Sequence, residues 1–455
     1  MRLRFLPLAA ALMALSAPSY ALDLLGALHL AEEHDPNLAA VRANRMAASQ
    51  GTTIARAGLL PRVVANASYS DNTLKQDSSG STDYRSTQWS AKLSQPLFRW
   101  DAWYQNEAAK AQRSQAEAHA DEQTQNLFLA IAEAYFNVLR AEDNLTLGQA
   151  QEAAFNRQRE QADARFQVGL VARADVIEAE AQRDNATALR LTAENAVNSA
   201  RASLNSALGQ DVGRLARLPE TLTSPPPVPD DPQAWADMAR ERNPGLISAR
   251  HGASAANSAR QAQRGAYLPQ IDFFASYGDR DNGSSTNPAV AFNSGTSEVV
   301  GIEANWELFA SGRTMASVKQ AEYQATAAHE QARAQEQQIT NSARTSFLTV
   351  KTDSARLLAR QRAQASAQLA YDATQAGYSV GTRNIVDLLL AETNLHAARR
   401  DYANARYDYV INSLRLQAVA GMLSEATVSQ INEGLVEDEA APVATTTAAG
   451  ASGQN

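Results

Sequence analysis

Two pairs of segments alternate apolar and polar residues with a period of two, which is the pattern of β-strands with two unlike faces. In the first segment, Val63, Ala65 and Ala67 alternate with Asn66 and Ser68. Each segment has about ten residues, the length that a tilted transmembrane strand needs. The same alternation also fits a soluble hairpin. The predicted strands cover about residues 62–72, 87–98, 270–279 and 298–309.

The stretches between the paired strands, residues 73–86 and 280–297, are rich in Ser, Gly, Asp, Asn and Thr. Such residues are typical of solvated hairpin loops. If the strands cross a membrane, we expect the loops around Asp77–Ser81 and Asn282–Asn287 to face the outside of the cell.

After each strand pair the apolar period becomes helical. The sequence predicts two long helical hairpins, at about residues 101–209 and 312–424. Apolar residues in the first hairpin follow an alternating spacing of four and three, the spacing of a coiled-coil seam. At 1.5 Å per residue, the longer helices would reach roughly 100 Å. Because the seams contain so much alanine, they favour close, extended helix layers over a fibrous coiled coil. The seam residues are Leu127, Ile131, Ala134, Val138, Ala141 and Leu145.

The two halves of the chain repeat each other in the order of their parts and in individual residues. Each half begins with a short helix that is interrupted near Pro36 or Pro244 and continues with a strand pair and a helical hairpin. The order of the matching residues never changes, so the sequence predicts two structural repeats. Pro36, Arg42, Arg56, Pro61 and Tyr69 recur as Pro244, Arg250, Arg264, Pro269 and Tyr277, and Gly169 and Asp175 recur as Gly381 and Asp387.

These patterns divide the chain into five parts. We predict a signal peptide at residues 1–21, a first repeat at 22–219, a Pro-rich linker at 220–233, a second repeat at 234–432 and a disordered tail at 433–455. Two arginines, a short apolar run and a small-residue cleavage site at Ala21 support the signal peptide. No later stretch approaches the roughly 20 apolar residues of a membrane helix, so any membrane span is expected to be β.

Composition excludes several kinds of site and partner. The chain has no cysteine, which excludes disulfides, thiolate metal sites and a lipid-modified cysteine. Its formal net charge of −8 opposes binding to the phosphates of nucleic acid, so no nucleic-acid partner is expected. The six histidines are scattered singly and no catalytic motif is present, so we expect no catalytic residue, cofactor or metal site, and no enzyme.

Four strands cannot close a membrane barrel, and unpaired strand edges are not tolerated in lipid. Several chains must therefore share one barrel if the strands span a membrane. Two chains would give a filled interior, whereas three would give twelve strands and the beginning of a lumen. The sequence thus predicts a homotrimer whose shared barrel is continued by a helical barrel.

The turn of the second hairpin carries a specific motif, Ala376-Gly377-Tyr378-Ser379-Val380-Gly381-Thr382-Arg383, followed by Ile385-Val386-Asp387 and later by Ala403-Asn404-Ala405-Arg406-Tyr407. This motif resembles the second-repeat signature of the TolC family, and Val168-Gly169-Leu170-Val171-Ala172 agrees with the first. The resemblance covers nearly the whole chain after the signal peptide. It implies a trimeric outer-membrane β-barrel in contact with lipid, a helical barrel crossing the periplasm of a Gram-negative bacterium, and export of drugs or type I secreted proteins.

The same resemblance implies partners and sites. The partners are a periplasmic adaptor protein and an inner-membrane transporter of the ABC or RND type. The adaptor is expected to dock at the two turns, and a periplasmic gate is expected where the tyrosine and arginine of the second turn link to the aspartate after the first. The docking residues are Val168, Gly169, Leu170, Val380, Gly381 and Thr382, and the gate residues are Asp175, Tyr378, Arg383 and Asp387.

Two departures from the family pattern concern this gate. Ala174 replaces a threonine that helps the link, so we expect a looser link. The resemblance also implies that Asp387 of three chains forms a ring of carboxylates at the constriction, which attracts cations. Leu390 replaces a second acidic residue one turn beyond Asp387, so we expect this ring to be less charged. Without the resemblance, Asp175 and Asp387 fit simple helix N-termini, where negative charge is favourable. A trimeric coiled-coil adhesin and a periplasmic adaptor are the alternative functions, but neither needs two copies of a strand pair with a helical hairpin. The cargo stays open.

Overall fold

The computed structural model describes residues 21–76, 80–283 and 294–436. Residues 1–20 of the predicted signal peptide and residues 437–455 of the predicted tail lie outside these ranges, as do most of the two loops expected to face outward. The described chain divides into two compact units, and two long helices contribute to both. One unit comprises residues 36–124 and 233–343, and the other comprises residues up to 35, 125–232 and 344 onward.

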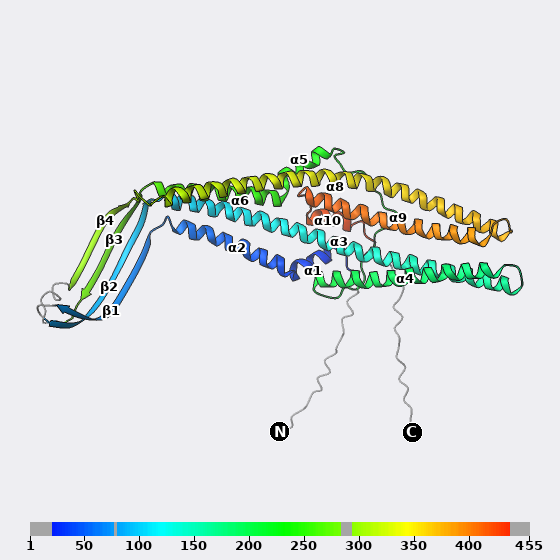
Figure 1. Cartoon of the computed structure of the whole chain (residues 1–455), viewed down its shortest axis with the longest axis horizontal. Coiled ribbons are helices and arrows are strands. Elements are labelled where there is room, and N and C mark those ends of the chain that lie inside the picture. Colours follow the sequence, from blue (N-terminus) through cyan, green and yellow to red (C-terminus); the bar gives the residue numbers. More distant parts are fainter. Residues whose placement is uncertain (1–20, 77–79, 284–293, 437–455) are drawn as a thin grey trace, which may run out of the picture. The chain divides into compact units, whose positions relative to one another are not determined.

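The unit of residues 36–124 and 233–343 contains a four-stranded antiparallel sheet in the order β1-β2-β3-β4, with its strands side by side (Figure 1). This sheet joins the strand pairs of both repeats, because β2 of the first pair bonds to β3 of the second. The strands are β1 (Arg62–Gln76), β2 (Gly80–Phe98), β3 (Gln270–Asp281) and β4 (Gly295–Asn305).

The register places the predicted apolar faces on the same side of the sheet. Directly paired residues share a face, and one row across all four strands reads Val63, Leu93, Ala275 and Val300. The neighbouring row, shifted by one residue, reads Val64, Lys92, Ser276 and Val299. The period-two prediction of one apolar and one more polar face is therefore confirmed for the row of Val63.

The prediction that residues 73–86 form a loop is mostly wrong. Residues 73–76 pair with residues 80–83, so the hairpin continues almost to its tip. Polar side chains do not prevent pairing where water surrounds the strands, because the backbone ladder supplies the hydrogen bonds. At the other end, residues 306–309 lie beyond β4, which ends at Asn305, although they were predicted to be strand.

Helices of the same unit follow the predicted interrupted pattern. The break in the second repeat has a clear cause, because the Asn243 side chain accepts a hydrogen bond from the Leu246 N–H at 3.1 Å and Pro244 occupies the first helical turn. This is a helix start with a strong N-cap. The helices are α2 (Pro36–Ala57), α5 (Pro232–Arg242), α6 (Pro244–Arg264) and the first parts of α3 (Trp100–Gln167) and α8 (Arg313–Ser379), with a 3-10 turn at Gly265–Tyr267.

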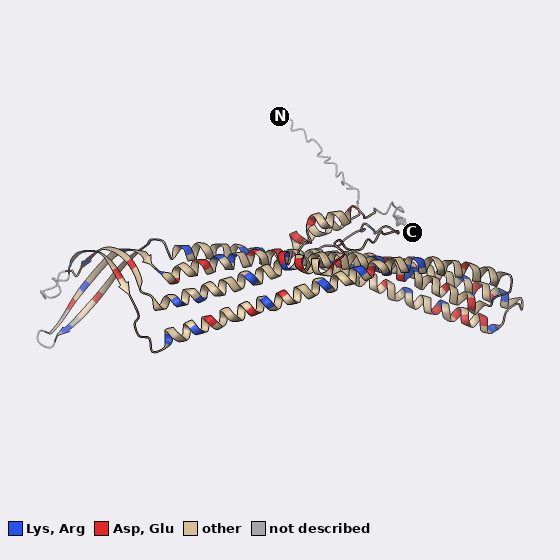
Figure 2. Ribbon diagram, turned by 90° about the horizontal axis from the view of Figure 1, so that it is seen from above, with Lys and Arg blue, Asp and Glu red and all other residues tan. Residues whose placement is uncertain are grey.

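The other unit contains the two predicted helical hairpins. Helix α3 returns through α4 (Arg173–Leu208), and α8 returns through α9 (Ile385–Val419). Two short helices, α1 (Leu24–His34) and α10 (Glu425–Asn432), also belong to this unit. Acidic and basic residues are interspersed along the helices (Figure 2). In the parts of the chain that the structure describes, no helix is long and apolar enough to span a membrane.

The main core of this unit is a cluster around Tyr135, Phe136 and Leu139 of α3, all 0 to 1% exposed. Leucines of α1, α4 and α9 pack onto it, among them Leu28, Leu204 and Leu414. Helix α10 is tied to α1 by a reciprocal contact, in which Asn432 accepts from the Leu24 N–H at 3.0 Å and donates to the Asp23 carboxylate at 2.7 Å.

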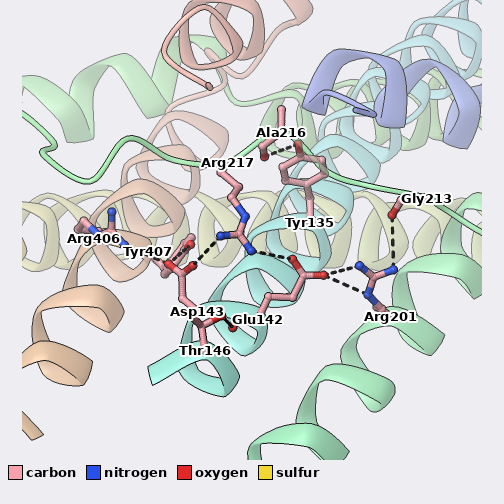
Figure 3. A network of polar contacts seen from close by, with 10 residues as sticks. All are labelled: Tyr135, Glu142, Asp143, Thr146, Arg201, Gly213, Ala216, Arg217, Arg406 and Tyr407. Carbon is pink, nitrogen blue, oxygen red and sulfur yellow. Dashed lines mark hydrogen bonds and ion pairs between the residues drawn. The ribbon is translucent and has the colours of Figure 1, made fainter. Parts of the chain in front are cut away.

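A polar network lies beside this core (Figure 3). The Tyr135 hydroxyl donates to the carbonyl of Ala216 at 2.8 Å, and the Asp143 carboxylate accepts from Tyr407 at 2.7 Å and from Arg406 at 3.0 Å. Arg406 also donates to the Pro219 carbonyl at 2.8 Å. The network therefore attaches the segment after α4 to helices of both repeats.

The residues after α10 correct one boundary. Residues 433–436 were assigned to the disordered tail, but the Val436 N–H donates to the Arg217 carbonyl at 2.8 Å and its own carbonyl accepts from the Arg217 N–H at 3.0 Å. This two-way backbone pair fixes the chain at residue 436, where composition alone showed no apolar period.

Candidate functional site at the two helical turns

Both hairpins turn with the same backbone motif. Where α3 ends, the Gly169 N–H donates to the Phe166 carbonyl at 2.9 Å and the Leu170 N–H donates to the Arg165 carbonyl at 2.9 Å. Where α8 ends, Gly381 and Thr382 donate to Tyr378 and Gly377 at 3.1 and 2.9 Å. This pair of bonds is the Schellman motif, which needs a left-handed residue after the helix.

Glycine is required at both turns by conformation and not by space. The φ angles are +74° at Gly169 and +80° at Gly381, and a Cβ added at either position would meet nothing within 4 Å. An L-residue in this region is strained by roughly 1–2 kcal/mol. The repeated glycine of the sequence therefore marks the two hairpin reversals.

The turns present apolar side chains to solvent. Val168, Leu170 and Val380 are 69%, 74% and 74% exposed. Thr382 has its hydroxyl bonded to the Gly377 carbonyl at 3.0 Å, so it closes its own turn. Exposed aliphatic residues clustered at a surface are typical of a contact with another protein.

The helices that leave the turns begin with different caps. Asn384 accepts from the Asp387 N–H at 2.7 Å and caps α9. Helix α4 has Ala172 at its N-cap, which offers no side-chain acceptor, and Asp175 instead accepts from the Ala172 N–H at 3.2 Å. Both aspartates thus occupy the first helical turn, where a negative charge is favourable.

The four predicted gate residues lie in the same unit, but within the described part of one chain neither Tyr378 nor Arg383 forms a hydrogen bond or ion pair with Asp175. Arg383 pairs with Asp387 at 3.7 Å, and both side chains are at least 40% exposed. Such an exposed pair contributes at most about 1 kcal/mol. The Tyr378 hydroxyl is buried and has no hydrogen-bond partner within the described residues.

Tyr378 packs on a second apolar cluster that connects both hairpins. The guanidinium of Arg165 lies 4.7 Å from the Tyr378 ring centroid, a cation–π contact that the sequence analysis missed. Val176, one residue after Asp175, packs on the same cluster, so residues that follow the first turn and precede the second turn contact one apolar cluster. The cluster consists of Phe155, Ala162, Ala179, Ala186, Ile385 and Leu389.

Next to this cluster, α9 carries two buried titratable residues that the sequence analysis did not assign to the site. Glu392 is 4% exposed and His396 is 7% exposed, and one polar atom of each has no hydrogen-bond partner in the described structure. Burial, followed by the nearby Arg399, lowers the pKa of His396 to about 4. Burial raises the pKa of the Glu392 carboxyl, while Arg157 and Gln158 oppose that shift.

No group of three or more His, Cys, Asp or Glu side chains within the described ranges is arranged to hold a metal ion. The site at the turns consists of capped helix ends, exposed aliphatic residues and exposed or half-buried charges. These features suit contacts that form and break between chains.

Comparison with known proteins agrees with the two-repeat architecture. The model of the outer membrane efflux protein family matches residues 27–210 and 235–422, one segment for each repeat. The chain is 32% identical to the outer membrane protein TolC of Vibrio cholerae, covering 95% of this chain and 98% of that protein. It is 30% identical to the alkaline protease secretion protein AprF of Pseudomonas aeruginosa, covering 94% and 90%.

A solved structure, the CmeC outer membrane channel of Campylobacter jejuni, superposes with a TM-score of 0.76 at 16% identity, covering 90% of this chain and 89% of that one. At 16% identity the superposition shows a shared fold and nothing more. Together with the family match over both repeats, it confirms the TolC-like fold class predicted from the sequence. The chain belongs to the outer membrane efflux protein family and is an export channel of the outer membrane.

Proposed function

We propose that three copies of this chain form one continuous export channel and that the chain is not an enzyme. The observation that carries the proposal is the open sheet, in which β1 and β4 are both edge strands. An edge in lipid leaves backbone groups without partners, and each such group costs several kcal/mol. Pairing of β1 of one copy with β4 of the next removes every edge when the ring closes, and three copies give twelve strands around a lumen.

The side chains of the edge strands support this arrangement. On the apolar face, Val63 of β1 is 68% exposed, and Val300 and Ile302 of β4 are 71% and 68% exposed. A barrel places this face against lipid and the opposite face, which carries Lys92 and Ser90, toward the lumen.

Cysteine pairs test the pairing between copies, because the chain has no cysteine of its own. Cysteines placed one on β1 and one on β4, scanned along Val63–Tyr69 and Glu298–Ile302, should give covalent dimers and trimers after oxidation. The control pair is Leu93→Cys with Ala275→Cys, which lie opposite each other within one chain and should give cross-linked monomers only. Monomers alone from every edge pair would overturn the shared barrel.

We also propose that Asp175, Tyr378, Arg383 and Asp387 form the gate of the assembled channel. Within the described part of one chain the Tyr378 hydroxyl is buried without a hydrogen-bond partner, and a buried hydroxyl in this state costs about 1–3 kcal/mol. A carboxylate brought close in the closed trimer, with Asp175 as the family pattern implies, would satisfy it. The Arg383–Asp387 pair is long and exposed, so Arg383 can exchange Asp387 for Asp175 at little cost.

Planar-bilayer recordings test the gate. The double variant Tyr378→Phe with Arg383→Ser should raise single-channel conductance, and Asp387→Ala should weaken block by multivalent cations. Arg313→Ser is the control, because it removes an arginine that pairs with Glu307 in the other unit. Unchanged conductance in an intact trimer of the double variant would leave the aspartates as ordinary helix caps.

The exposed aliphatic residues of the two turns are the proposed docking points of a periplasmic adaptor, behind which an inner-membrane ABC or RND transporter supplies cargo. Replacing Leu170 or Val380 by aspartate should abolish export while the trimer still assembles. A photoreactive residue at Thr382 should cross-link to the adaptor in cells. Full export by both aspartate variants would reject docking at the turns.

A further inference from the structure

A groove of about 410 Å³ lies between α3, α4 and α9, and its lining includes neither the gate residues nor the turns. Its volume falls in the range of about 300–1,000 Å³ that is typical of sites for small molecules. Apolar side chains form most of its surface, so it can hold the apolar part of a ligand. They include Leu147, Leu189, Ala193, Ala196 and Ala200.

The ionised residues of this groove are all cationic. Arg140 of α3 and Arg400 of α9 line it, and no carboxylate of the described residues does. Arg140 already pairs with Asp408 at 2.8 Å. Arg400 is exposed and forms no ion pair with the residues that the structure describes. The groove therefore combines an apolar surface with a positive charge that the described chain does not neutralise.

Three lining residues have a buried side-chain atom without a hydrogen-bond partner in the described structure. The atoms are Nδ1 of His396, Oδ1 of Asn144 and Nε of Arg140. His396 is 7% exposed, and burial lowers its pKa to about 4, so the imidazole is neutral at neutral pH and Nδ1 can donate or accept. Buried polar atoms are nearly always paired, so three unpaired ones at one groove indicate the place of a polar ligand group.

We propose that this groove binds a small anionic amphiphile, with its apolar body against α4 and its acidic group at Arg400 and His396. Arg400 attracts the charge, and an N–H of the His396 imidazole donates a charge-assisted hydrogen bond to the acidic group. The bound molecule contacts α3 and α4 of the first hairpin and α9 of the second, and therefore connects the two hairpins.

The extent of the groove favours a small molecule over a helix of another protein. The lining residues of α4 run from Leu189 to Ala200, which is roughly three helical turns. A helix laid along the hairpin would need a groove that continues over many more turns. This inference depends neither on the proposed gate nor on the proposed docking points, because none of those residues lines the groove.

Cysteine protection in the full-length assembled protein, held in amphipol without free detergent, tests the proposal. The thiol introduced by Ala196→Cys lies in the groove on an exposed position of α4 and should react with a maleimide. Sodium dodecanoate should slow this reaction in a saturable manner, whereas dodecylammonium, with the same chain length and the opposite charge, should slow it little. Ala188→Cys is the matched control, because it is exposed on the same helix and does not line the groove.

Charge and hydrogen-bond variants in the Ala196→Cys background locate the acidic group. Arg400→Gln should raise the dodecanoate concentration for half-protection about fivefold, since pairs of exposed charges are partly screened. His396→Leu should raise it about tenfold, because it removes a buried donor to a charged group. Arg362→Gln, which removes an exposed arginine of α8 outside the groove, should leave it unchanged.

Three results would overturn the proposal, each in a different way. A thiol at position 196 that does not react even without dodecanoate would mean that a second copy of the chain covers the groove. A reaction that dodecanoate does not slow would leave a helix of another protein as the occupant. Equal protection by dodecanoate and dodecylammonium, or protection that Arg400→Gln and His396→Leu leave unchanged, would mean non-specific binding of the apolar chain.

Discussion

His396 provides a sharp test of the packing between the two hairpins. It is 7% exposed on α9, and its ring lies 6.3 Å from the ring of Phe155 on α3. Burial is the main cause of the lowered pKa of His396, and Arg399 of the same helix adds to the cost of a second positive charge. The folded state therefore prefers the neutral imidazole.

The sign of the pH effect follows from linkage. The pKa falls from 6.5 in the unfolded chain to about 4 in the folded chain, so between these values the unfolded state binds more protons. Stability from this group is complete above pH 6.5 and is lost as the pH falls toward 4. At pH 5 the loss amounts to about 2 kcal/mol per chain, from the ratio of the two protonation polynomials.

The Glu392 carboxyl changes the pH dependence of stability in the opposite direction to His396. Its pKa is raised in the folded state, so above about pH 4.5 the folded chain holds more protons at this carboxyl than the unfolded chain does. Its contribution therefore weakens as the pH rises. The total pH profile of the wild type mixes both groups, and only a comparison with a variant lacking His396 isolates the imidazole.

The assay is urea unfolding of the detergent-solubilised protein, followed by circular dichroism at pH 7.5 and pH 5. His396→Gln should reduce the loss of unfolding free energy between these pH values by about 2 kcal/mol per chain. His329→Gln is the control, since that side chain is 69% exposed on α8. If His396→Gln and the wild type lose the same free energy on acidification, the reasoning from burial is refuted.

Two further substitutions test other parts of the structure. Tyr135→Phe leaves the buried Ala216 carbonyl without its 2.8 Å hydrogen bond and should reduce the unfolding free energy by about 1–2 kcal/mol. The control Tyr323→Phe, at a residue that is 73% exposed, should change it little, and equal effects of the two variants in urea unfolding would contradict this. Gly381→Ala should lower the unfolding free energy by about 1 kcal/mol, because residue 381 has a positive φ. The control Gly51→Ala, within α2, should raise the unfolding free energy slightly, and no effect of Gly381→Ala in the same assay would argue against the turn geometry.

The sequence alone determined the elements and their order. Side-chain periods of two and of about three and a half are imposed by the backbone, so they remain readable without any tertiary information. The interrupted helices at Pro36 and Pro244, the strand pairs and both hairpins follow from such local signals. Gly169 and Gly381 were identifiable as reversals for the same reason, because a left-handed residue after a helix is a local requirement.

Only the tertiary structure decided how these elements meet. The pairing of β2 with β3 joins the two repeats in one sheet, and the pairing of β1 with β2 extends the first hairpin through residues that are polar enough to be taken for a loop. It also decided that His396 and Glu392 are buried and that Val436 is fixed by Arg217. These outcomes depend on which surfaces of distant segments face each other, and no local pattern of residues records that choice.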